Sequence, residues 1–255
     1  TISRRLASLE EELGAKIVRR LSRSTPLTEK GREFLALAQQ VEAKVKQVER
    51  LATLRSCGVS GTIRLSAPPA FLSESLIPHL AFIGEAHPDL RLVFVAETKI
   101  TSLEQGHADI AVRLTEPTFQ QGVVRKLGDI SYSLFGTLQN INRPRNEWRF
   151  IGFDQAMKHL PLYKWLDEFA VGRPCDVVSN DIHVQKAAAE AGLGIALLPD
   201  RIANQSVNLV RANTRKPKPQ TAWLVIHPDM RHSEAVRVVA DAIVSVFADS
   251  DDPGR

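Results

Sequence analysis

The fold is decided by the stretch Gly61-Thr-Ile-Arg-Leu-Ser-Ala-Pro-Pro-Ala-Phe-Leu-Ser73, in which a strand-like run leads directly into a helical one. Further strand-like runs at 90–96 and 109–113 alternate with helical runs at 72–86 and 100–106. Alternation of strands and helices is typical of βαβ units, which build a parallel sheet. The sequence therefore predicts an α/β fold class.

The alternation breaks once and restarts toward the C-terminus. A strand at 132–137 is followed by the irregular segment 138–147 and then by the elements of a second unit. Those elements are expected as a strand at 148–153, a helix near 163–170, a strand near 176–179 and a helix from 181 to 191. A strand at 222–227 is expected to return to the first unit, and 233–248 to form a closing amphipathic helix. We therefore predict two α/β lobes with a cleft between them, lobe I at about 61–135 and 220–255 and lobe II at about 136–219.

The first residues of the chain form an amphipathic helix in this interpretation. Ile2, Leu6, Leu9 and Leu13 follow one another at spacings of four, three and four, which places them on one helical stripe, and Gly14 is positioned to end the helix. The opposite face carries short or hydrogen-bonding side chains that could approach base edges and phosphates. We expect partner helices for the apolar stripe upstream of this segment.

A hairpin is expected next, with β-like stretches at 16–19 and 25–27 around a basic tip at 21–24. Thr28 then caps a long helix that carries an apolar heptad seam. The seam consists of Phe34, Ala38, Val41, Val45, Val48 and Ala52. It needs a partner, either a second copy of this helix or the body of the protein, and we favour self-association. Small residues at 56–61 indicate a linker, which divides the chain into 1–27, 28–60 and 61–255.

The positive charge of the chain is concentrated at its N-terminal end. The chain has 33 Lys and Arg against 29 Asp and Glu, and residues 1–56 hold twelve of the former but only seven of the latter. Lys16, Arg19, Arg20 and Arg23 follow one another without an intervening acid, as in clusters that neutralise phosphates. No apolar run approaches the roughly 18 residues that a bilayer span requires, and no signal-peptide core is present. We therefore expect a cytoplasmic protein without a membrane partner.

The sequence offers little for catalysis or metal binding. It contains no nucleophile elbow, zinc-protease motif or phosphate loop, and Gly192-Leu-Gly194 lies between a helix and a strand, where it serves a turn. Cys57 and Cys175 lie too far apart for a metal-ligand spacing. His227 and His232 near Asp229 are more typical of a surface than of a metal site. We expect no catalytic residue, no metal and no cofactor, hence a protein that is not an enzyme.

The N-terminal segments resemble a known family. Residues 1–20 and Leu27-Thr-Glu-Lys-Gly31 resemble the recognition helix, the wing and the start of the linker helix of LysR-type transcriptional regulators. Residues 61–66, 108–114 and 190–199 are similar to the effector domain of that family, which itself resembles type 2 periplasmic binding proteins. The resemblance covers essentially the whole chain and implies a partial winged helix-turn-helix, a linker helix and a two-lobed effector domain. Two departures are the absence of the two helices that usually precede the recognition helix, and a short segment from 137 to 148.

The resemblance implies that the first helix lies in the major groove of DNA. The residues expected to contact DNA are Thr1, Ser3, Arg4, Arg5, Ser8, Arg20 and Arg23. Arg4 is expected to set base specificity, whereas Arg20 and Arg23 on the wing are expected to add affinity through phosphates. A dimer paired through the seam would bind a two-fold related operator.

A small effector is expected between the lobes, because open α/β sheets bind ligands at the carboxyl ends of their strands. The candidate residues are Ser66, Ala70, Phe71, Thr98, Arg113, Phe153 and Asn180. Each could instead be a helix cap or a core residue, and Arg113 could pair with an anionic effector or brace the hinge.

The partners expected are double-stranded DNA, a small effector with an anionic molecule favoured, a second copy in a homodimer that pairs further into a tetramer, and RNA polymerase. Bound effector is expected to change lobe closure and so to move the paired recognition helices. The alternative is a solute-sensing module without a DNA-binding role, which would leave the basic N-terminal end and the seam unexplained. A small-molecule enzyme on a two-lobed scaffold is a third hypothesis.

Overall fold

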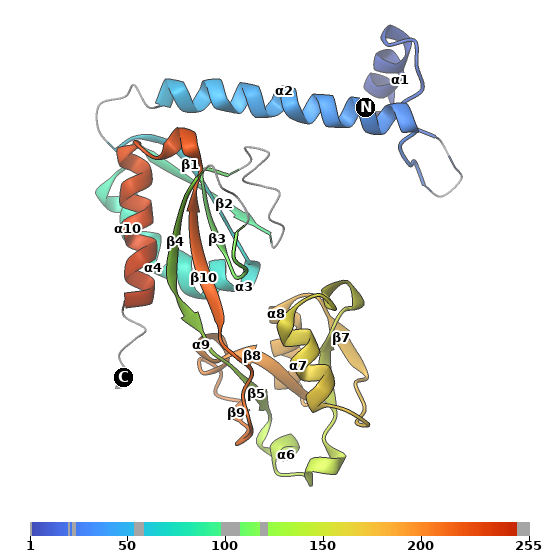
Figure 1. Ribbon diagram of the computed structural model, residues 1–255, viewed down its shortest axis with the longest axis vertical. Coiled ribbons are helices and arrows are strands. Elements are labelled where there is room, and N and C mark those ends of the chain that lie inside the picture. Colours follow the sequence, from blue (N-terminus) through green and yellow to red (C-terminus); the bar gives the residue numbers. More distant parts are fainter. Residues whose placement is uncertain are drawn as a thin grey trace.

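The computed structural model describes residues 2–19, 21, 24–53, 59–97, 108–117 and 122–248. Helix α1 (Ile2–Glu12) and the long helix α2 (Glu29–Thr53) lie outside a two-lobed α/β body (Figure 1). The predicted hairpin between these helices is confirmed, since Val18 and Leu27 form an antiparallel bridge. The predicted N-cap of α2 is confirmed as well, because the Gly31 N–H donates to the Thr28 hydroxyl at 2.9 Å.

The first lobe is built on a five-stranded sheet with the order β2-β1-β3-β10-β4. Its strands are β1 (Gly61–Ala67), β2 (Leu90–Ala96), β3 (Ile110–Arg113), β4 (Val123–Ile130) and β10 (Gln220–Ile226). The first three strands run parallel to one another, and β10 pairs antiparallel with both β3 and β4. The late strand thus returns to the first lobe as predicted.

Helices bury their apolar faces against this sheet. They are α3 (Pro69–Phe71), the π-helical turn η1 (Leu72–Leu76), α4 (Ile77–Ala86), the 3₁₀ turn η4 (Pro228–Met230) and α10 (Glu234–Ala248). The stripe of α10 repeats at three and four residues, with Val236, Val239, Ile243 and Val246 all buried in one core cluster.

The second lobe has its own five-stranded sheet with the order β7-β6-β8-β5-β9. Its strands are β5 (Tyr132–Gly136), β6 (Phe150–Phe153), β7 (Val177–Ser179), β8 (Ile195–Pro199) and β9 (Val210–Arg211). Helix α7 (Pro161–Phe169) covers one face, and α8 (Ile182–Glu190) and α9 (Asp200–Ala203) cover the other. Short helical pieces complete the lobe: α6 (Leu138–Ile141), η2 (Arg145–Glu147) and η3 (Gln155–Met157).

The chain passes between the lobes twice. The first crossing is the single residue Ser131 between β4 and β5, and the second is the segment 212–219 between β9 and β10. The first crossing falls a few residues before the division that we expected between 135 and 136, because β5 pairs with β8 and β9 rather than with lobe I. The run of strand formers through this region continues across the crossing, so the sequence pattern does not mark it.

The two-lobed α/β fold class is confirmed, and the helix expected at 72–86 is present, with its first turn widened into η1. The helix expected at 100–106 lies outside the described residues. Within the described parts of the chain, no helix combines the length and apolar character needed to cross a membrane.

Candidate functional site

Helix α1 presents the polar face that the sequence predicts. Ser3, Arg4, Arg5 and Ser8 are all exposed to solvent on this helix, and Ile2 on the apolar stripe is 86% exposed. The polar face of the helix is therefore accessible to another molecule. Thr1, Arg20 and Arg23, the other residues expected to contact DNA, lie outside the described residues.

A buried carboxylate that the sequence analysis missed holds α1 against the hairpin. Glu10 accepts hydrogen bonds from the main-chain N–H groups of Ile17 at 2.9 Å and Val18 at 3.1 Å, and its other oxygen lies 2.8 Å from the Lys16 ammonium. The Lys16 hydrogen bond, followed by that of Val18, lowers the pKa of Glu10 from 4.5 to about 2. A negative charge in the last turn of a helix interacts unfavourably with the helix dipole. The position of Glu10 in that turn was the sequence signal that its carboxylate needed a partner.

The hairpin is fixed equally firmly to the start of α2. The Thr28 hydroxyl donates to the Lys16 carbonyl at 2.7 Å, and the Thr28 N–H donates to the Ile17 carbonyl at 3.0 Å. Gly31 lies against that same carbonyl so closely that an added Cβ would be only 1.9 Å from the Ile17 oxygen. Helix α1, the hairpin and the first turn of α2 thus form one unit.

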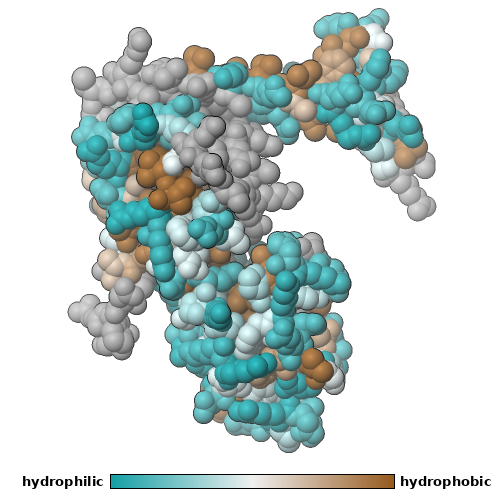
Figure 2. Space-filling view, viewed as in Figure 1, coloured by the Kyte–Doolittle hydropathy of each residue, from teal (hydrophilic) through white to brown (hydrophobic). Residues whose placement is uncertain are grey.

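The middle of the α2 seam is exposed to solvent. Val41, Val45 and Val48 are 64%, 54% and 67% exposed, whereas Phe34 at the start of the seam is half-buried. Figure 2 shows hydrophobic residues at the surface along this helix. Valines at heptad spacing are typical of a helix that packs against another helix, and a second copy of α2 would bury them.

Two of the residues expected at the effector site contact each other. The buried Arg113 guanidinium donates to the Ser66 hydroxyl at 2.9 Å and to the Ser66 carbonyl at 3.0 Å, which joins the carboxyl ends of β3 and β1. Burial lowers the pKa of Arg113, and Glu97 opposes that shift. Through these bonds Arg113 braces the first sheet.

A cavity of about 200 Å³ lies at the junction of the lobes. Ala70 and Phe71, both predicted at the effector site, line it from lobe I, and the ring of Phe247 lies 5.5 Å from that of Phe71. Lobe II contributes residues from the starts of α8 and α9, and the first crossing, Ser131, lines the cavity as well.

Two residues that line the junction cavity each hold a buried polar atom that has no hydrogen-bond partner within the described parts of the chain. These are the hydroxyl of Ser75, which is 1% exposed, and the Oδ1 atom of Asp200. Buried polar groups without a partner cost free energy and are rare in folded proteins, so each indicates a bound molecule or water. The sequence analysis missed both residues, since both lie in helices, where a polar residue is ordinarily solvated.

Asp200 also contacts both crossings. Its main-chain N–H donates to the Ser131 carbonyl at 2.9 Å, and its Oδ2 atom lies 3.3 Å from the ammonium of Lys216, in the second crossing. Arg211, at the end of β9, lies 3.4 Å from the same oxygen. The carboxylate thus joins the junction cavity to the segments that connect the lobes.

Ser66 and Arg113 do not line the junction cavity, and neither do Phe153 and Asn180. Phe153 lines a different cavity within lobe II, and Asn180 is exposed. Thr98 lies outside the described residues. A strand end was the only signal for these positions, and it does not show which face of the sheet the side chain occupies.

Direct contacts also join the lobes. The Ser73 hydroxyl of η1 lies 2.9 Å from Nε2 of His183 at the start of α8, and Glu74 lies 3.7 Å from Nδ1 of the same ring. The Arg201 guanidinium donates to the Val246 carbonyl of α10 at 3.0 Å. These polar contacts connect η1 and α10 of lobe I to α8 and α9 of lobe II.

Together, the exposed helix-and-hairpin unit, the long helix and the two-lobed body with a junction cavity are the architecture of a ligand-responsive DNA-binding regulator. Residues 57–248 match the LysR substrate binding domain. The match covers most of the chain, and the chain belongs to the family of LysR-type transcriptional regulators. The predicted family and the regulator function are thereby confirmed.

Curated relatives extend the likeness along the chain. It is 27% identical over 256 residues to the Mau operon transcriptional activator of Paracoccus denitrificans, across 98% of this chain and 87% of that protein. It is 28% identical over 246 residues to the HTH-type transcriptional regulator cbl of Escherichia coli, across 88% of this chain and 76% of that protein.

Solved structures share the fold. The full-length virulence activator AphB of Vibrio cholerae superimposes with a TM-score of 0.70 at 18% identity, covering 96% of this chain and 89% of that one. CrgA, a LysR-type regulator of Neisseria meningitidis, gives a TM-score of 0.64 at 20% identity, covering 96% and 88%.

Proposed function

We propose that this protein binds a two-fold related operator through α1 and the hairpin, and that a small effector in the junction cavity modulates DNA binding or activation. The observation that carries the effector half of the proposal is a cavity lined by both lobes, two of whose lining residues, Ser75 and Asp200, each hold a buried polar atom without a partner among the described residues. The basic, exposed N-terminal unit carries the DNA half.

On the DNA side, Arg4 is the proposed base-reading residue, with Ser3, Arg5 and Ser8 beside it on the exposed face. A guanidinium that bonds the edge of guanine contributes roughly 1 to 3 kcal/mol of discrimination. Thr1 is assigned to the same surface, and Arg20 and Arg23 are assigned to phosphates, which add affinity without sequence information.

The seam of α2 is proposed to pair two protomers and so to set the separation of the two α1 helices on DNA. Its six residues, from Phe34 to Ala52, are the proposed dimer contacts. Further pairing of dimers into a tetramer and contact with RNA polymerase complete the proposed assembly. We place its activity in the cytoplasm and assign it no catalytic role, in keeping with relatives that are transcriptional regulators.

The chemistry of the junction cavity narrows the class of effector. Its walls are mostly apolar, from Ala70, Phe71, Ile130 and Phe247. The Asp200 carboxylate oxygen can only accept a hydrogen bond, and it repels an anion. A compact apolar molecule with a hydrogen-bond donor therefore fits best. The anionic effector favoured by the sequence would instead need to reach Arg113, whose guanidinium is engaged with Ser66.

An effector that touches both lobes favours one degree of closure over another only if it binds the two states differently. In this proposal, closure breaks the contact between Ser73 and His183 and rotates lobe II about Ser131. Because α2 packs against η4 of lobe I, this turn is proposed to move the α1 helices of a dimer relative to each other.

The decisive experiment measures binding of the full-length protein to the DNA upstream of its own gene across a salt series, with unrelated DNA as competitor. We expect selective, salt-sensitive binding that Arg4→Ala weakens about 5- to 150-fold, the equivalent of roughly 1 to 3 kcal/mol. Arg91→Ala, which removes an exposed arginine from β2 in lobe I, should leave binding unchanged. If no selective binding occurs at any salt concentration, the protein is a sensing module without a DNA-binding role.

A further inference from the structure

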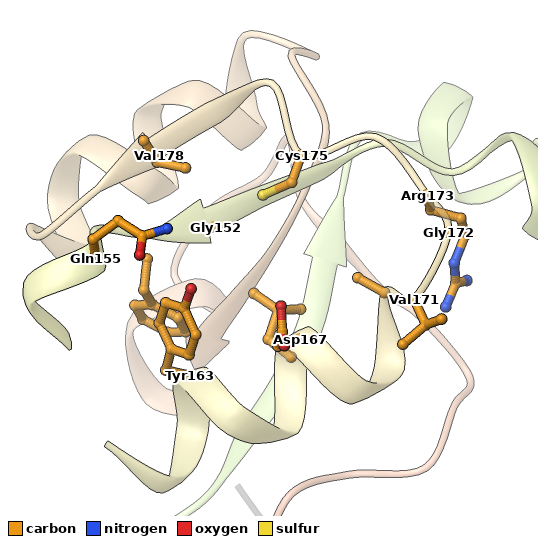
Figure 3. Close-up of a pocket in the computed structure, with 12 residues that line it drawn as sticks. Gly152, Gln155, Tyr163, Asp167, Val171, Gly172, Arg173, Cys175 and Val178 are labelled. Atoms are coloured by element: carbon orange, nitrogen blue, oxygen red, sulfur yellow. The ribbon is translucent and has the colours of Figure 1, made fainter. Parts of the chain in front are cut away.

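A second cavity of about 420 Å³ lies within lobe II, between α7 and the strands β6 and β7 (Figure 3). It shares no lining residue with the junction cavity. Its volume is in the range of sites for small molecules. Nothing in the regulator function proposed above uses it.

Helix α7 places one charged side chain among the apolar ones on the cavity side. Tyr163, Leu166 and Ala170 line the cavity at the three- and four-residue spacing of one helical face, and Asp167 lies on the same face four residues after Tyr163. Phe153 and Val178 form the opposite wall from β6 and β7. Figure 3 shows the Asp167 carboxylate and the Cys175 thiol pointing into the space between helix and strands.

Asp167 is the one acidic residue among the described ones that line this cavity, and it is exposed to solvent. It forms no ion pair or side-chain hydrogen bond with any part of the chain that the structure describes, whereas the nearby Asp176 is paired with Arg149. Burial, followed by the charges of Asp176 and Asp167, raises the pKa of the Cys175 thiol.

The arginine at the cavity edge does not neutralise Asp167. The Arg173 guanidinium lies over the rings of Phe150 and Phe169, at 4.8 and 5.0 Å from their centres, and donates to the Arg145 carbonyl. Arg173 lines the cavity beside Val171 and Gly172 (Figure 3). Lys164, three residues before Asp167, forms no ion pair with it among the described residues. Lys164 and Lys158 line an adjoining hollow, which Gln155, Tyr163 and Asp167 line as well.

We propose that this cavity binds an organic cation, a protonated amine that carries a small hydrocarbon group. Asp167 would pair with the ammonium, and the faces of Tyr163 and Phe153 would attract the same charge. The Tyr163 hydroxyl and the Gln155 amide oxygen can accept the remaining N–H groups. Leu166 and Val178 would cover the hydrocarbon. The protein would thus respond to a second ligand at a site that belongs to lobe II alone.

The first test is calorimetric titration of the full-length protein with phenethylammonium, beside 2-phenylethanol and 3-phenylpropionate as neutral and anionic analogues of similar shape. We expect saturable binding of the ammonium at least tenfold tighter than that of either analogue. Asp167→Asn should weaken ammonium binding at least tenfold. Glu168→Gln, the matched change of an exposed carboxylate that does not line this cavity, should alter it less than twofold.

The second test uses Cys175, whose exposed thiol lines the cavity. Saturating phenethylammonium should slow its alkylation by iodoacetamide at least threefold, measured by peptide mass spectrometry with Cys57 as the internal reference. Asp167→Asn should abolish the protection, and Ser75→Ala at the junction cavity should leave it intact, which separates this proposal from the effector proposal. Equal binding of the three compounds, wild-type affinity in Asp167→Asn, or an unprotected Cys175 would each overturn the proposal.

Discussion

The Glu10 carboxylate lies 2.9 Å from the main-chain nitrogen of Ile17, so the last turn of α1 directly holds the first strand of the hairpin. The pKa of Glu10 is lowered to about 2 from an ordinary 4.5, which means that the folded unit favours the charged form. The contribution of Glu10 to stability is therefore fully present above about pH 4.5 and is lost as the pH falls toward 2.

We expect the amides of Ile17 and Val18 to lose protection from hydrogen exchange as the pH is lowered through this range, ahead of the amides of lobe I. Glu10→Gln should show weaker protection already at neutral pH and little further change on acidification. Glu11→Gln, the same substitution at the exposed neighbour, serves as the control and should behave like the wild type. Equal protection in Glu10→Gln and wild type would argue against a role of the charge.

Gly31 is expected to tolerate no side chain, because its added Cβ would overlap the Ile17 carbonyl. We predict that Gly31→Ala lowers the free energy of unfolding of the N-terminal unit by about 1 to 3 kcal/mol, as overpacking does. The matched control is Gly84→Ala in α4, where nothing lies within 4 Å of the added Cβ. There the removal of a helical glycine should stabilise the protein by roughly 0.5 to 1 kcal/mol. Denaturant unfolding of the two variants should give opposite signs.

The bond between Arg113 and Ser66 leads to a prediction for lobe I. Ser66→Ala removes a hydroxyl that accepts from a buried guanidinium, and we expect it to lower the free energy of unfolding by about 1 to 3 kcal/mol. Arg113→Lys should cost at least as much, since an ammonium cannot donate in the same two-pronged geometry to the Ser66 hydroxyl and carbonyl. Unfolding midpoints in urea test both. Losses below 0.5 kcal/mol, in either variant, would contradict a bracing role.

Because the seam of α2 is the proposed dimer contact, a charged substitution in it is expected to change the assembly state of the protein. Val45→Glu places a charge in the middle of the seam and should shift the protein toward monomers in sedimentation velocity, by at least tenfold in the dissociation constant. Ala36→Glu changes an exposed residue on the opposite side of the same helix and should leave the assembly state unchanged. If both variants sediment as the wild type does, the seam is not the dimer contact.

The elements of the body could be predicted from the sequence because each strand or helix buries a periodic set of apolar residues. Val236, Val239, Ile243 and Val246 in α10 follow that rule and lie in the core of lobe I. Periodicity shows that a residue is buried but not which sheet its strand joins. For this reason β5 was expected in lobe I, although it pairs with β8.

The candidate site was predictable only in part. Expected effector residues line two different cavities. Phe71, which follows β1, lines the junction cavity, whereas Phe153, at the end of β6, lines the cavity in lobe II. Ser75 and Asp200 escaped prediction because the residues that surround the junction cavity range from Pro68 to Phe247, and no local sequence pattern brings such distant segments together.

Asp200 gives the junction a mechanical property. Its main chain bonds the first crossing, its Oδ2 atom lies near Lys216 in the second, and its buried Oδ1 atom has no hydrogen-bond partner among the described residues. A ligand that donated a hydrogen bond to Oδ1 would weaken the interactions that the same carboxylate makes with the crossings. It would thereby alter the stiffness of the hinge as well as its angle. The regulator would then respond to its effector through the ease with which the lobes fluctuate, even where their average separation stays the same.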